Sequence, residues 1–415
     1  MPADITWPFG WGNFEVLRNS IFFDFLNRRA NQGFDRFISD TVQDVDYIDW
    51  NGFALPFDYG EDEFEYTELR NRCAIFDSTP LQKIQIRGSE SGYLLDRTLT
   101  RSVSELPSMR ATYAVMCNDD GTIKDDAILY KFDDDEYLFM PSDIDHTPYF
   151  KSLCERFDLK DVSFTNVSES LAGMAVQGPA STSALLHMGF KNLEDLRPFD
   201  VRDYRLGRGV VRVSRVGFTA DLGYECWMAT ELAPAFRERI VATRLEMDLA
   251  MPGYGLRTLE SCRLEGGFVV AGWDFATELD PQPDFERTPF EVDLGWIVDL
   301  DGTDFVGRDA LITRQRSGPY FLLRRFQSTD RIEVEDGEII SSDIDGKNME
   351  IGFVACSSWS WGLERTIGNA SIQAAFADAT DAWLMIGGEK IHISLERKPL
   401  LNPERRSQVP APLWG

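Results

Sequence analysis

Two stretches of the chain place their hydrophobic residues at the spacing of an amphipathic helix. In residues 14–30, FEVLRNSIFFDFLNRRA, apolar side chains recur every three or four positions, and Asn13 precedes them as an N-cap. The recurring residues are Phe14, Leu17, Ile21, Phe22, Phe25 and Leu26. After Thr230, Leu232, Phe236 and Ile240 recur every four residues. We therefore predict one helix that docks by its apolar face near the N-terminus and a second helix after residue 230.

Short runs of alternating apolar and polar residues lie between these two segments and predict strands. They are QKIQIRG at 82–88, DEYLFM at 135–140, GMAVQG at 173–178 and GVVRVSRVGF at 209–218. Because strands and helices mix in an irregular order, the pattern favours an α+β fold over a regular array of β–α–β units.

The hydrophobic pattern changes near residues 312–330, where the chain becomes polar and loses its periodicity. Beyond this point, strand-like pieces at 351–361, 369–377 and 389–399 are separated by Gly, Asn and Asp, which predicts a small C-terminal β-barrel. We predict three parts: an N-terminal extension with an amphipathic helix (1–47), a main domain (48–315) and the barrel with its tail (316–415).

Composition and charge argue against several classes of function. The 415 residues carry a formal net charge of −27 without a local cluster of Lys or Arg, so we expect neither nucleic acid nor an anionic membrane as a partner. The chain has no run of about 18 apolar residues. Its start lacks the basic-then-apolar order of a secretory signal, and we expect a cytoplasmic protein.

The motifs that hold common cofactors are missing from the sequence. Neither a GxGxxG after a strand nor a GxxxxGK[ST] occurs, so we expect no NAD and no flavin. Six cysteines form no CxxC pair and only three histidines are present, so we expect no metal site. Catalysis should then depend on carboxylates, tyrosines or arginines.

The segment NDDGTIKDDAILYKF at 118–132 joins a tight turn to a strand that begins with two adjacent acids. With a period of two, Asp126 shares a face with Ile128, Tyr130 and Phe132, and we expect this face to be buried. Asp125 falls on the other face, where we expect it to be solvated. Burial would raise the pKa of Asp126, so that its carboxyl could exchange a proton near neutral pH.

Four stretches stand out for chemistry, although a turn, a solvated acid pair or a surface ion pair would explain each one alone. They are YAVMCNDDGTIKDD (113–126), AVQGPAS (175–181), VSRVGFTADLGYECW (213–227) and YGLRTLESCRLEGG (254–267). Their order, together with IDWNGFALPFDYG, RNRCAIFDST, TPFEVDLGWIVDL, DFVGRDAL and GFVACSSWSWGLERTIGNASI, resembles the folate-binding aminomethyltransferase family. The glycine-cleavage T-protein typifies this family, which includes tetrahydrofolate-dependent demethylases. The resemblance runs from about Ile48 to the C-terminus.

The resemblance implies a three-lobed cloverleaf. Two related α+β lobes would form a folate channel, and a C-terminal antiparallel β-barrel would close one side. By position, Asp126 matches the carboxylate that faces the reactive folate nitrogen, and Glu225 matches the acid that binds the pterin. Tyr113 and Tyr130 match tyrosines of the folate pocket. Tetrahydrofolate is accordingly the implied one-carbon acceptor.

The chemistry of these residue types suits the same ligand. One carboxylate, such as that of Glu225, can accept hydrogen bonds from the pterin N3–H and the 2-amino group together. The flat ring also favours aromatic walls, for which the candidates are Tyr113, Tyr130, Phe218 and Phe268. Tyr113 or Tyr130 could also protonate an oxygen that leaves the substrate.

The chain departs from the T-protein pattern at two places. It has SRVGFT and ADLG where T-proteins have SRxGYT and GEDG, so Phe218 replaces a pocket tyrosine. Leu259 stands where T-proteins have the arginine of GARD, and Arg257 lies two positions earlier. Both changes resemble the demethylase branch. The KGCYxGQE signature of iron–sulfur-assembly folate proteins is absent, and VVAGWDFATELDPQ occupies that region.

We therefore predict transfer of a methyl group from a small O-, S- or N-methylated compound to N5 of tetrahydrofolate. Arg215 or Arg257 is expected either to hold a substrate or folate carboxylate or to form a structural salt bridge. Trp273, Trp359 and Trp361 are candidates for the substrate side of the pocket, with core packing as the alternative.

Two other functions stay open. An aminomethyltransferase that acts on a lipoyl carrier protein would need a basic or hydrophobic docking patch around the pocket mouth. A non-catalytic folate-binding protein would tolerate Asp126→Asn without consequence. The sequence leaves the methyl donor and the oligomeric state open.

Overall fold

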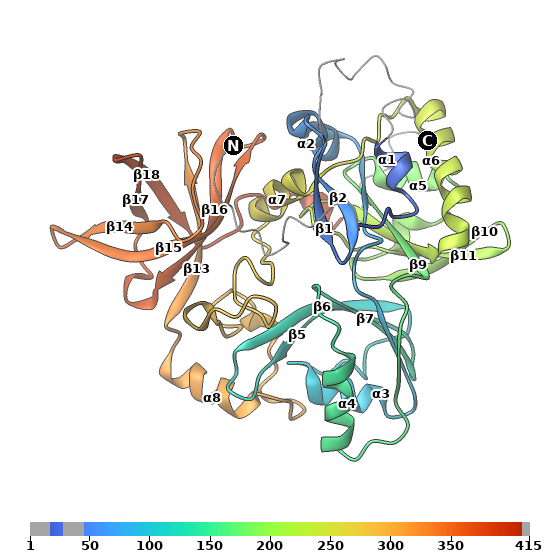
Figure 1. Ribbon diagram of the computed structural model, residues 1–415, viewed down its shortest axis with the longest axis horizontal. Coiled ribbons are helices and arrows are strands. Elements are labelled where there is room, and N and C mark those ends of the chain that lie inside the picture. The colour runs from blue at the N-terminus through green and yellow to red at the C-terminus, as the bar shows by residue number, and fades with distance from the viewer. Residues whose placement is uncertain (1–16, 28–44, 409–415) are drawn as a thin grey trace.

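The computed structural model describes residues 17–27 and 45–408, and these residues form three parts (Figure 1). Two lobes are each built on a five-stranded antiparallel sheet, and the third part is a closed six-stranded barrel. The α+β class and the C-terminal antiparallel barrel expected from the sequence are confirmed. Within the described residues, no helix has the length and apolar character needed to cross a membrane.

The first lobe carries the sheet with the strand order β10–β11–β12–β9–β3. These strands are β10 (Val201–Leu206), β11 (Gly209–Ser214), β12 (Gly223–Ala229), β9 (Leu171–Gln177) and β3 (Ala74–Asp77). Helices α5 (Ser181–His187) and α6 (Ala233–Met247) pack on it. Phe236 and Ile240 of α6 are fully buried in the core of this lobe, so the helix predicted after residue 230 is confirmed.

The second lobe carries the sheet with the strand order β5–β6–β7–β4–β8. These strands are β5 (Arg110–Cys117), β6 (Ile123–Asp133), β7 (Glu136–Pro141), β4 (Ile84–Arg87) and β8 (Ser163–Asn166). Helices α3 (Ser91–Thr98) and α4 (Thr147–Arg156) cover one face. On that face Leu129 of β6 packs with Phe139 and Phe150 in a buried core. The other face of β6 is turned toward the first lobe.

The barrel has the strand order β13–β16–β15–β14–β17–β18. Its strands are β13 (Phe321–Ser328), β14 (Ile339–Ile344), β15 (Lys347–Ser360), β16 (Arg365–Gln373), β17 (Asp381–Ile386) and β18 (Glu389–Glu396). Helix α8 (Arg308–Ser317) precedes the barrel, and Leu311 is its single buried residue. This shallow packing explains why the sequence loses its hydrophobic period near residue 312 although the chain is still helical there.

The predicted N-terminal helix is shorter in the described residues than its apolar spacing suggests. Helix α1 spans Phe23–Asn27, and positions 13–16 and 28–30 lie outside the described residues. Phe22, Phe25 and Leu26 are buried in the core of the first lobe, as a docking segment requires. Ile21 is 47% exposed because it lies in the turn before α1, where helical spacing does not apply.

A central group of elements lies between the lobes and the barrel (Figure 1). It consists of the hairpin β1 (Asp46–Trp50) and β2 (Phe53–Asp58) with the helices α2 (Asp62–Asn71) and α7 (Leu256–Glu265). Helix α7 contacts α2, β2 and the barrel strand β15. It therefore joins the central elements to the barrel.

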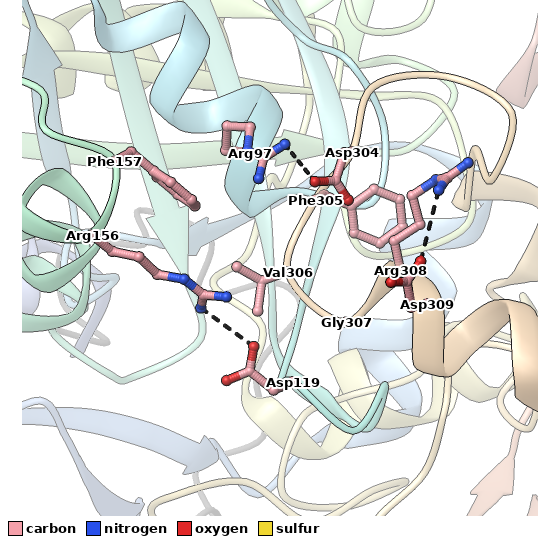
Figure 2. A pocket seen from close by; sticks show the side chains of 10 residues that line it. All are labelled: Arg97, Asp119, Arg156, Phe157, Asp304, Phe305, Val306, Gly307, Arg308 and Asp309. Atoms are coloured by element: carbon pink, nitrogen blue, oxygen red, sulfur yellow. Dashed lines mark hydrogen bonds and ion pairs between the residues drawn. The ribbon is translucent and has the colours of Figure 1, made fainter.

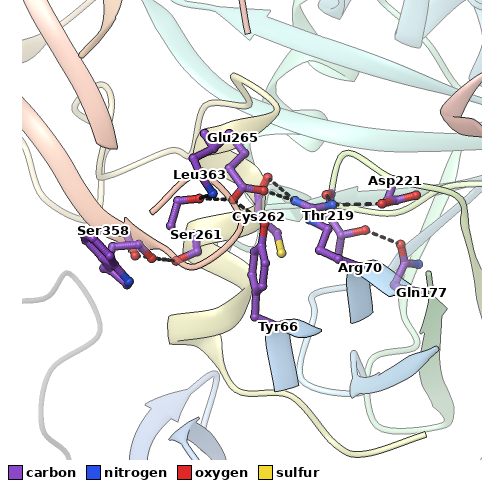
Figure 3. A network of polar contacts seen from close by, with 12 residues as sticks. Tyr66, Arg70, Gln177, Thr219, Asp221, Ser261, Cys262, Glu265, Ser358 and Leu363 are labelled. Carbon is purple, nitrogen blue, oxygen red and sulfur yellow. Dashed lines mark hydrogen bonds and ion pairs between the residues drawn. The ribbon is translucent and has the colours of Figure 1, made fainter. Parts of the chain in front are cut away.

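Arg70 of α2 organises a buried polar network at this junction (Figure 3). Its guanidinium contacts Glu265 at 2.5 Å and Asp221, in the loop between β11 and β12, at 3.2 Å. The Tyr66 hydroxyl also donates to Glu265 at 2.7 Å, and so does the hydroxyl of Ser360 at the end of β15. One guanidinium thus ties α2 to the first lobe and, through Glu265, to α7 and the barrel.

A second buried arginine, Arg263, lies in the segment CRLEGG, which also contains Glu265. Arg263 is fully buried, forms an ion pair with Glu260 and contacts Asp274 at 2.6 Å. Asp274 in turn accepts a hydrogen bond from Asn369 of β16 at 2.7 Å. Arg263 and Glu265 therefore anchor one helix turn in two different networks, which gives a physical reason for the charged residues of this motif.

Arg70→Met tests the first network by removing the cation and keeping most of the side-chain volume. Glu265 and Asp221 would each lose a partner in a buried setting. We expect the free energy of unfolding to fall by about 3–5 kcal/mol, read from urea denaturation at an unchanged slope.

Arg87→Gln is the matched surface control, because Arg87 is 54% exposed and its partner Glu136 is 29% exposed. We expect it to cost about 1 kcal/mol or less. Equally small losses in the two variants would show that the buried network does not hold the parts together.

Candidate functional site

The two lobes face each other across strand β6, and the predicted site residues gather on that face. In the pairing of β5 with β6, Val115 lies opposite Asp126 and Ala111 lies opposite Tyr130. Residues two or four positions apart on a strand point to the same side, so Asp126 and Tyr130 share one surface. The Tyr130 hydroxyl lies 3.3 Å from Ser214 Oγ of the first lobe. This face of β6 is therefore one wall of an interlobe site.

Asp126 and Tyr113 form a hydrogen-bonded pair at one end of the wall. The Tyr113 hydroxyl donates to Asp126 Oδ2 at 2.5 Å. Burial, together with the negative charge of Asp125, raises the pKa of Asp126 to about 7. Burial and the charge of Asp126 raise the pKa of Tyr113 well above its ordinary value, so this phenol keeps its proton. The pair consists of a fixed donor and a carboxyl that can titrate near neutral pH.

The prediction that Asp125 is solvated is wrong. Its carboxylate is fully buried and accepts hydrogen bonds from Ser142 Oγ and from the backbone N–H of Asp126, both at 2.8 Å. Its second oxygen lies 2.6 Å from His146 Nε2. Asp125 occupies the face of β6 that also carries Leu129, and the core of the second lobe covers this face. Asp125 therefore accepts a hydrogen bond from the backbone of Asp126 while its side chain lies on the opposite face of the sheet.

Glu225 of β12 lies at the other end of the wall. It accepts a hydrogen bond from the Tyr130 hydroxyl at 3.2 Å. Burial raises the pKa of Glu225 to about 7, while Tyr130 and Trp227 act in the opposite direction. A carboxylate offers about four acceptor positions, so Glu225 keeps capacity for a ligand with adjacent donors. Asp126 and Tyr130 are separated by about 13 Å along the strand, which sets the length of the site.

Phe218 and Phe268, two further candidates, form an aromatic pair. Their ring centroids are 5.3 Å apart and their planes differ by 27°. Phe218 lies in the loop that leads from β11 into β12, the strand of Glu225, and its side chain is 37% exposed. Phe268 follows the end of α7. Two candidates from distant segments therefore lie together, one of them on the loop that precedes the strand of Glu225.

Comparison with known proteins identifies the family. A family model described as the GCVT N-terminal domain matches residues 41–302, which is more than half of the chain. The chain belongs to this GCVT family. Its relatives include aminomethyltransferases of Thermoanaerobacter pseudethanolicus and Thermotoga maritima. The first is 27% identical over 354 residues, covering 85% of this chain and 90% of the relative. The second is 27% identical over 364 residues, covering 87% and 95%.

The GCVT fold is also seen in a solved structure, the glycine cleavage system aminomethyltransferase T from Bartonella henselae. The TM-score is 0.77 at 19% sequence identity, and the match covers 95% of this chain and 99% of that chain. The family resemblance and the three-part fold inferred from the sequence are confirmed. The GCVT family uses tetrahydrofolate. The spare acceptor positions of Glu225 and the aromatic side chains around it fit that group.

The two arginines considered for ligand carboxylates have other partners in this GCVT protein. Arg215 is buried and donates to backbone carbonyls, including that of Arg406 at 3.2 Å. Arg257 is on the surface, with its Nε 2.9 Å from Asp58 Oδ2. Of the two alternatives left open by the sequence, these contacts favour a structural role for both side chains.

The three predicted tryptophans pack against charged side chains. Trp359 and Trp361 meet edge to face at 6.2 Å, and the guanidinium of Arg331 lies 5.0 Å and 4.7 Å from their centroids. The guanidinium carbon of the buried Arg263 lies 5.5 Å from the ring of Trp273. These contacts favour the packing alternative over a substrate wall.

Trp296 is an aromatic residue of the site that the sequence did not single out. Its ring lies 6.5 Å from that of Tyr113 at an interplanar angle of 26°, and its side chain is 67% exposed. It lies in the short 3₁₀ turn η5 (Gly295–Ile297), so neither helical nor strand periodicity marks it. The sequence signal that could have indicated Trp296 is its position within TPFEVDLGWIVDL, one of the segments that carry the family resemblance.

Asp143 is a further carboxylate that the sequence did not reveal. It follows β7 and accepts hydrogen bonds from Trp50 Nε1 at 2.5 Å and Asn51 Nδ2 at 2.9 Å. Burial raises the pKa of Asp143 to about 6, and the charge of Asp125 acts in the same direction. Asp143 thereby fixes the tip of the β1–β2 hairpin beside the acids of β6.

A separate pocket of about 210 Å³ lies on the second lobe beside the start of α8 (Figure 2). Its cations are already paired: Arg97 contacts Asp304 at 2.6 Å, and Arg156 contacts Asp119 at 3.3 Å. None of the predicted site residues lines it. This pocket is therefore distinct from the interlobe site.

Asp125→Asn tests how the charge behind β6 acts on Asp126. A like charge disfavours ionisation, so its removal should lower the pKa of Asp126 below about 7. The measurement is a carbon-13 NMR titration of the Asp126 carboxyl group. Asp133→Asn removes a charge from the exposed end of the same strand and should leave this pKa unchanged. An Asp126 titration that is identical in Asp125→Asn and the wild type would show that burial alone raises the pKa.

Proposed function

We propose that this protein is a tetrahydrofolate-dependent demethylase. It would transfer a methyl group from a small O-, S- or N-methylated compound to N5 of tetrahydrofolate. The observation that carries the proposal is the arrangement of two carboxylate–tyrosine pairs, Asp126 with Tyr113 and Glu225 with Tyr130, at the two ends of one face of β6. One pair suits recognition of the pterin edge, and the other suits proton transfer.

When bound, tetrahydrofolate supplies the nucleophilic nitrogen of the reaction. Glu225 would accept the adjacent N–H groups of the pterin and so fix its orientation. Ionised Asp126 would accept the proton that N5 gives up, and the pKa of about 7 makes this group a suitable base at neutral pH. Tyr113 holds Asp126 in place and keeps a proton that it can donate to a departing oxygen.

Two substitutions relative to the T-protein pattern support demethylation over aminomethyl transfer. Phe218 has no hydroxyl at a position where T-proteins carry a tyrosine, and it stacks on Phe268. Leu259 replaces an arginine and packs in an apolar cluster with Leu69 and Cys262. The polar groups that these positions would offer to a lipoyl-bound substrate are therefore missing from this site.

A second candidate is transfer of the one-carbon unit from an aminomethylated lipoyl carrier protein to tetrahydrofolate. This candidate is favoured by the relatives that are similar to most of the chain, because these relatives are named aminomethyltransferases. The two candidates differ in the one-carbon donor, so a direct assay separates them. A non-catalytic folate-binding protein would give no product in either assay.

The first experiment is to incubate the protein with tetrahydrofolate and a panel of methoxybenzoates, sulfonium propionates and methylated glycines. We expect 5-methyltetrahydrofolate, detected by mass spectrometry, with one class of donor. Because Asp126 must be ionised, the rate should rise with pH through a midpoint near 7. Asp126→Asn cannot take up the proton and should lower the rate by about 10²–10⁴-fold.

The control reaction replaces the methyl donor with an aminomethylated lipoyl carrier. Product from the carrier alone would establish the second candidate. A flat pH profile through neutrality, or full activity of Asp126→Asn, would remove Asp126 from the proposed proton transfer.

Glu225→Gln tests the recognition end independently of turnover. The amide loses a charge-assisted interaction worth about 1.5–3 kcal/mol, so tetrahydrofolate should bind roughly 10- to 100-fold more weakly by calorimetry. Glu231→Gln removes the same charge from an exposed position of the same lobe and should leave the affinity unchanged. Equal affinities for Glu225→Gln and the wild type would place the pterin elsewhere.

A further inference from the structure

Arg406 is a cation without an ionic partner among the described residues. It lies in the 3₁₀ turn η7 (Glu404–Arg406), beyond the segment that the family model matches. The neighbouring arginines have partners: Arg405 contacts Asp221 at 2.5 Å and 2.7 Å, and Arg215 donates to backbone carbonyls. Within residues 17–27 and 45–408, no hydrogen bond or ion pair involves the guanidinium of Arg406. This contrast sets Arg406 apart from the structural arginines.

The first lobe holds the backbone at residues 405 and 406 in place. Arg215 donates to the carbonyls of Arg405 at 3.3 Å and Arg406 at 3.2 Å. Arg405 is fixed by Asp221, and both Arg215 and Asp221 are buried. The side chain of Arg406 is therefore presented from an anchored turn.

The guanidinium of Arg406 lies on the aromatic pair of the site. Its central carbon is 4.7 Å from the centroid of Phe268, which stacks on Phe218. Partial burial lowers the pKa of Arg406, and no carboxylate of the described residues offsets the lost hydration. A cation kept in this setting without a counter-charge is costly unless a ligand supplies one.

The two phenylalanines connect this cation to segments that carry residues of the site. Phe218 lies in the loop that joins Ser214, a contact of Tyr130, to the strand of Glu225. Phe268 begins the segment that leads to Asp274, whose charge raises the pKa of Asp126. Arg406 is thus linked through Phe268 and Phe218 to the loop that leads into the strand of Glu225.

We propose that Arg406 binds a carboxylate of a ligand held in this site. That carboxylate belongs either to the glutamate end of folate or to an acid group of the methyl donor, so the inference rests on the proposed function. A guanidinium stacked on a ring keeps N–H groups in its own plane for bidentate pairing with a carboxylate. Arg406 therefore takes the role that the sequence suggested for Arg215 or Arg257.

The test is anaerobic calorimetry on the wild type, Arg406→Gln and Arg406→Lys. The two probes are tetrahydrofolate and 6-methyltetrahydropterin, which keeps the pterin ring and lacks the glutamate. We expect Arg406→Gln to bind tetrahydrofolate about 10-fold more weakly or worse, and to bind 6-methyltetrahydropterin as the wild type does. Arg406→Lys keeps the charge but lacks the planar guanidinium, so its affinity for tetrahydrofolate should lie between those of the wild type and Arg406→Gln. It also carries the test if Arg406→Gln fails to fold.

Arg397→Gln is the matched control. It removes an exposed arginine of the same C-terminal region, where the partner is Asp378, and should bind both probes as the wild type does. The melting temperature of each variant verifies that it is folded.

The outcomes distinguish the two sources of the carboxylate. If Arg406→Gln keeps its tetrahydrofolate affinity but shows a KM for a carboxylated donor raised about 10-fold, with no change for the corresponding amide, the partner is the donor. Unchanged folate affinity together with an unchanged donor KM would overturn the inference and leave the proposed function standing. Failure of the wild-type chain to bind tetrahydrofolate would overturn both.

Discussion

A buried charge needs compensating partners, and two buried arginines join the first lobe, the central elements and the barrel. Arg70 links α2 to a loop of the first lobe and to α7, and Arg263 links α7 to Asp274 and through it to the barrel. Neither guanidinium can leave its carboxylates without exposing an uncompensated charge to the interior. The two networks around α7 therefore fix the position of the first lobe relative to the central elements and the barrel.

The same constraint separates the structural acids from the reactive ones. Asp221, Glu265 and Asp274 each face an arginine, whereas Asp126 and Glu225 face tyrosine hydroxyls. A phenol donates a hydrogen bond without cancelling the negative charge. Burial therefore raises the pKa of both Asp126 and Glu225 to about 7, and these two carboxyl groups remain able to change protonation state. Burial and an uncharged hydrogen-bond donor together leave these two carboxyl groups of the interlobe face able to titrate.

Much of the fold could be predicted from the sequence, because strand alternation and the order of motifs report local structure and family. The face on which Asp126 lies could be predicted from the period of two. The burial of Asp125 could not, because alternation does not say what covers the opposite face of the sheet. Contacts between distant segments were also invisible: Arg215 holds a turn 190 residues further along the chain. The role of Trp296 depends on its position next to Tyr113, which no local pattern encodes.

The position of Trp296 also allows ligand binding to be followed by intrinsic tryptophan fluorescence. Among the described tryptophans it is the single one with an exposed side chain, and it stacks on the tyrosine that donates to Asp126. A quencher dissolved in water reaches such an indole before it reaches the others. A molecule bound beside Tyr113 would shield the ring, so the intrinsic fluorescence that remains quenchable reports occupancy. Binding could then be followed continuously, without a label on either the protein or the ligand.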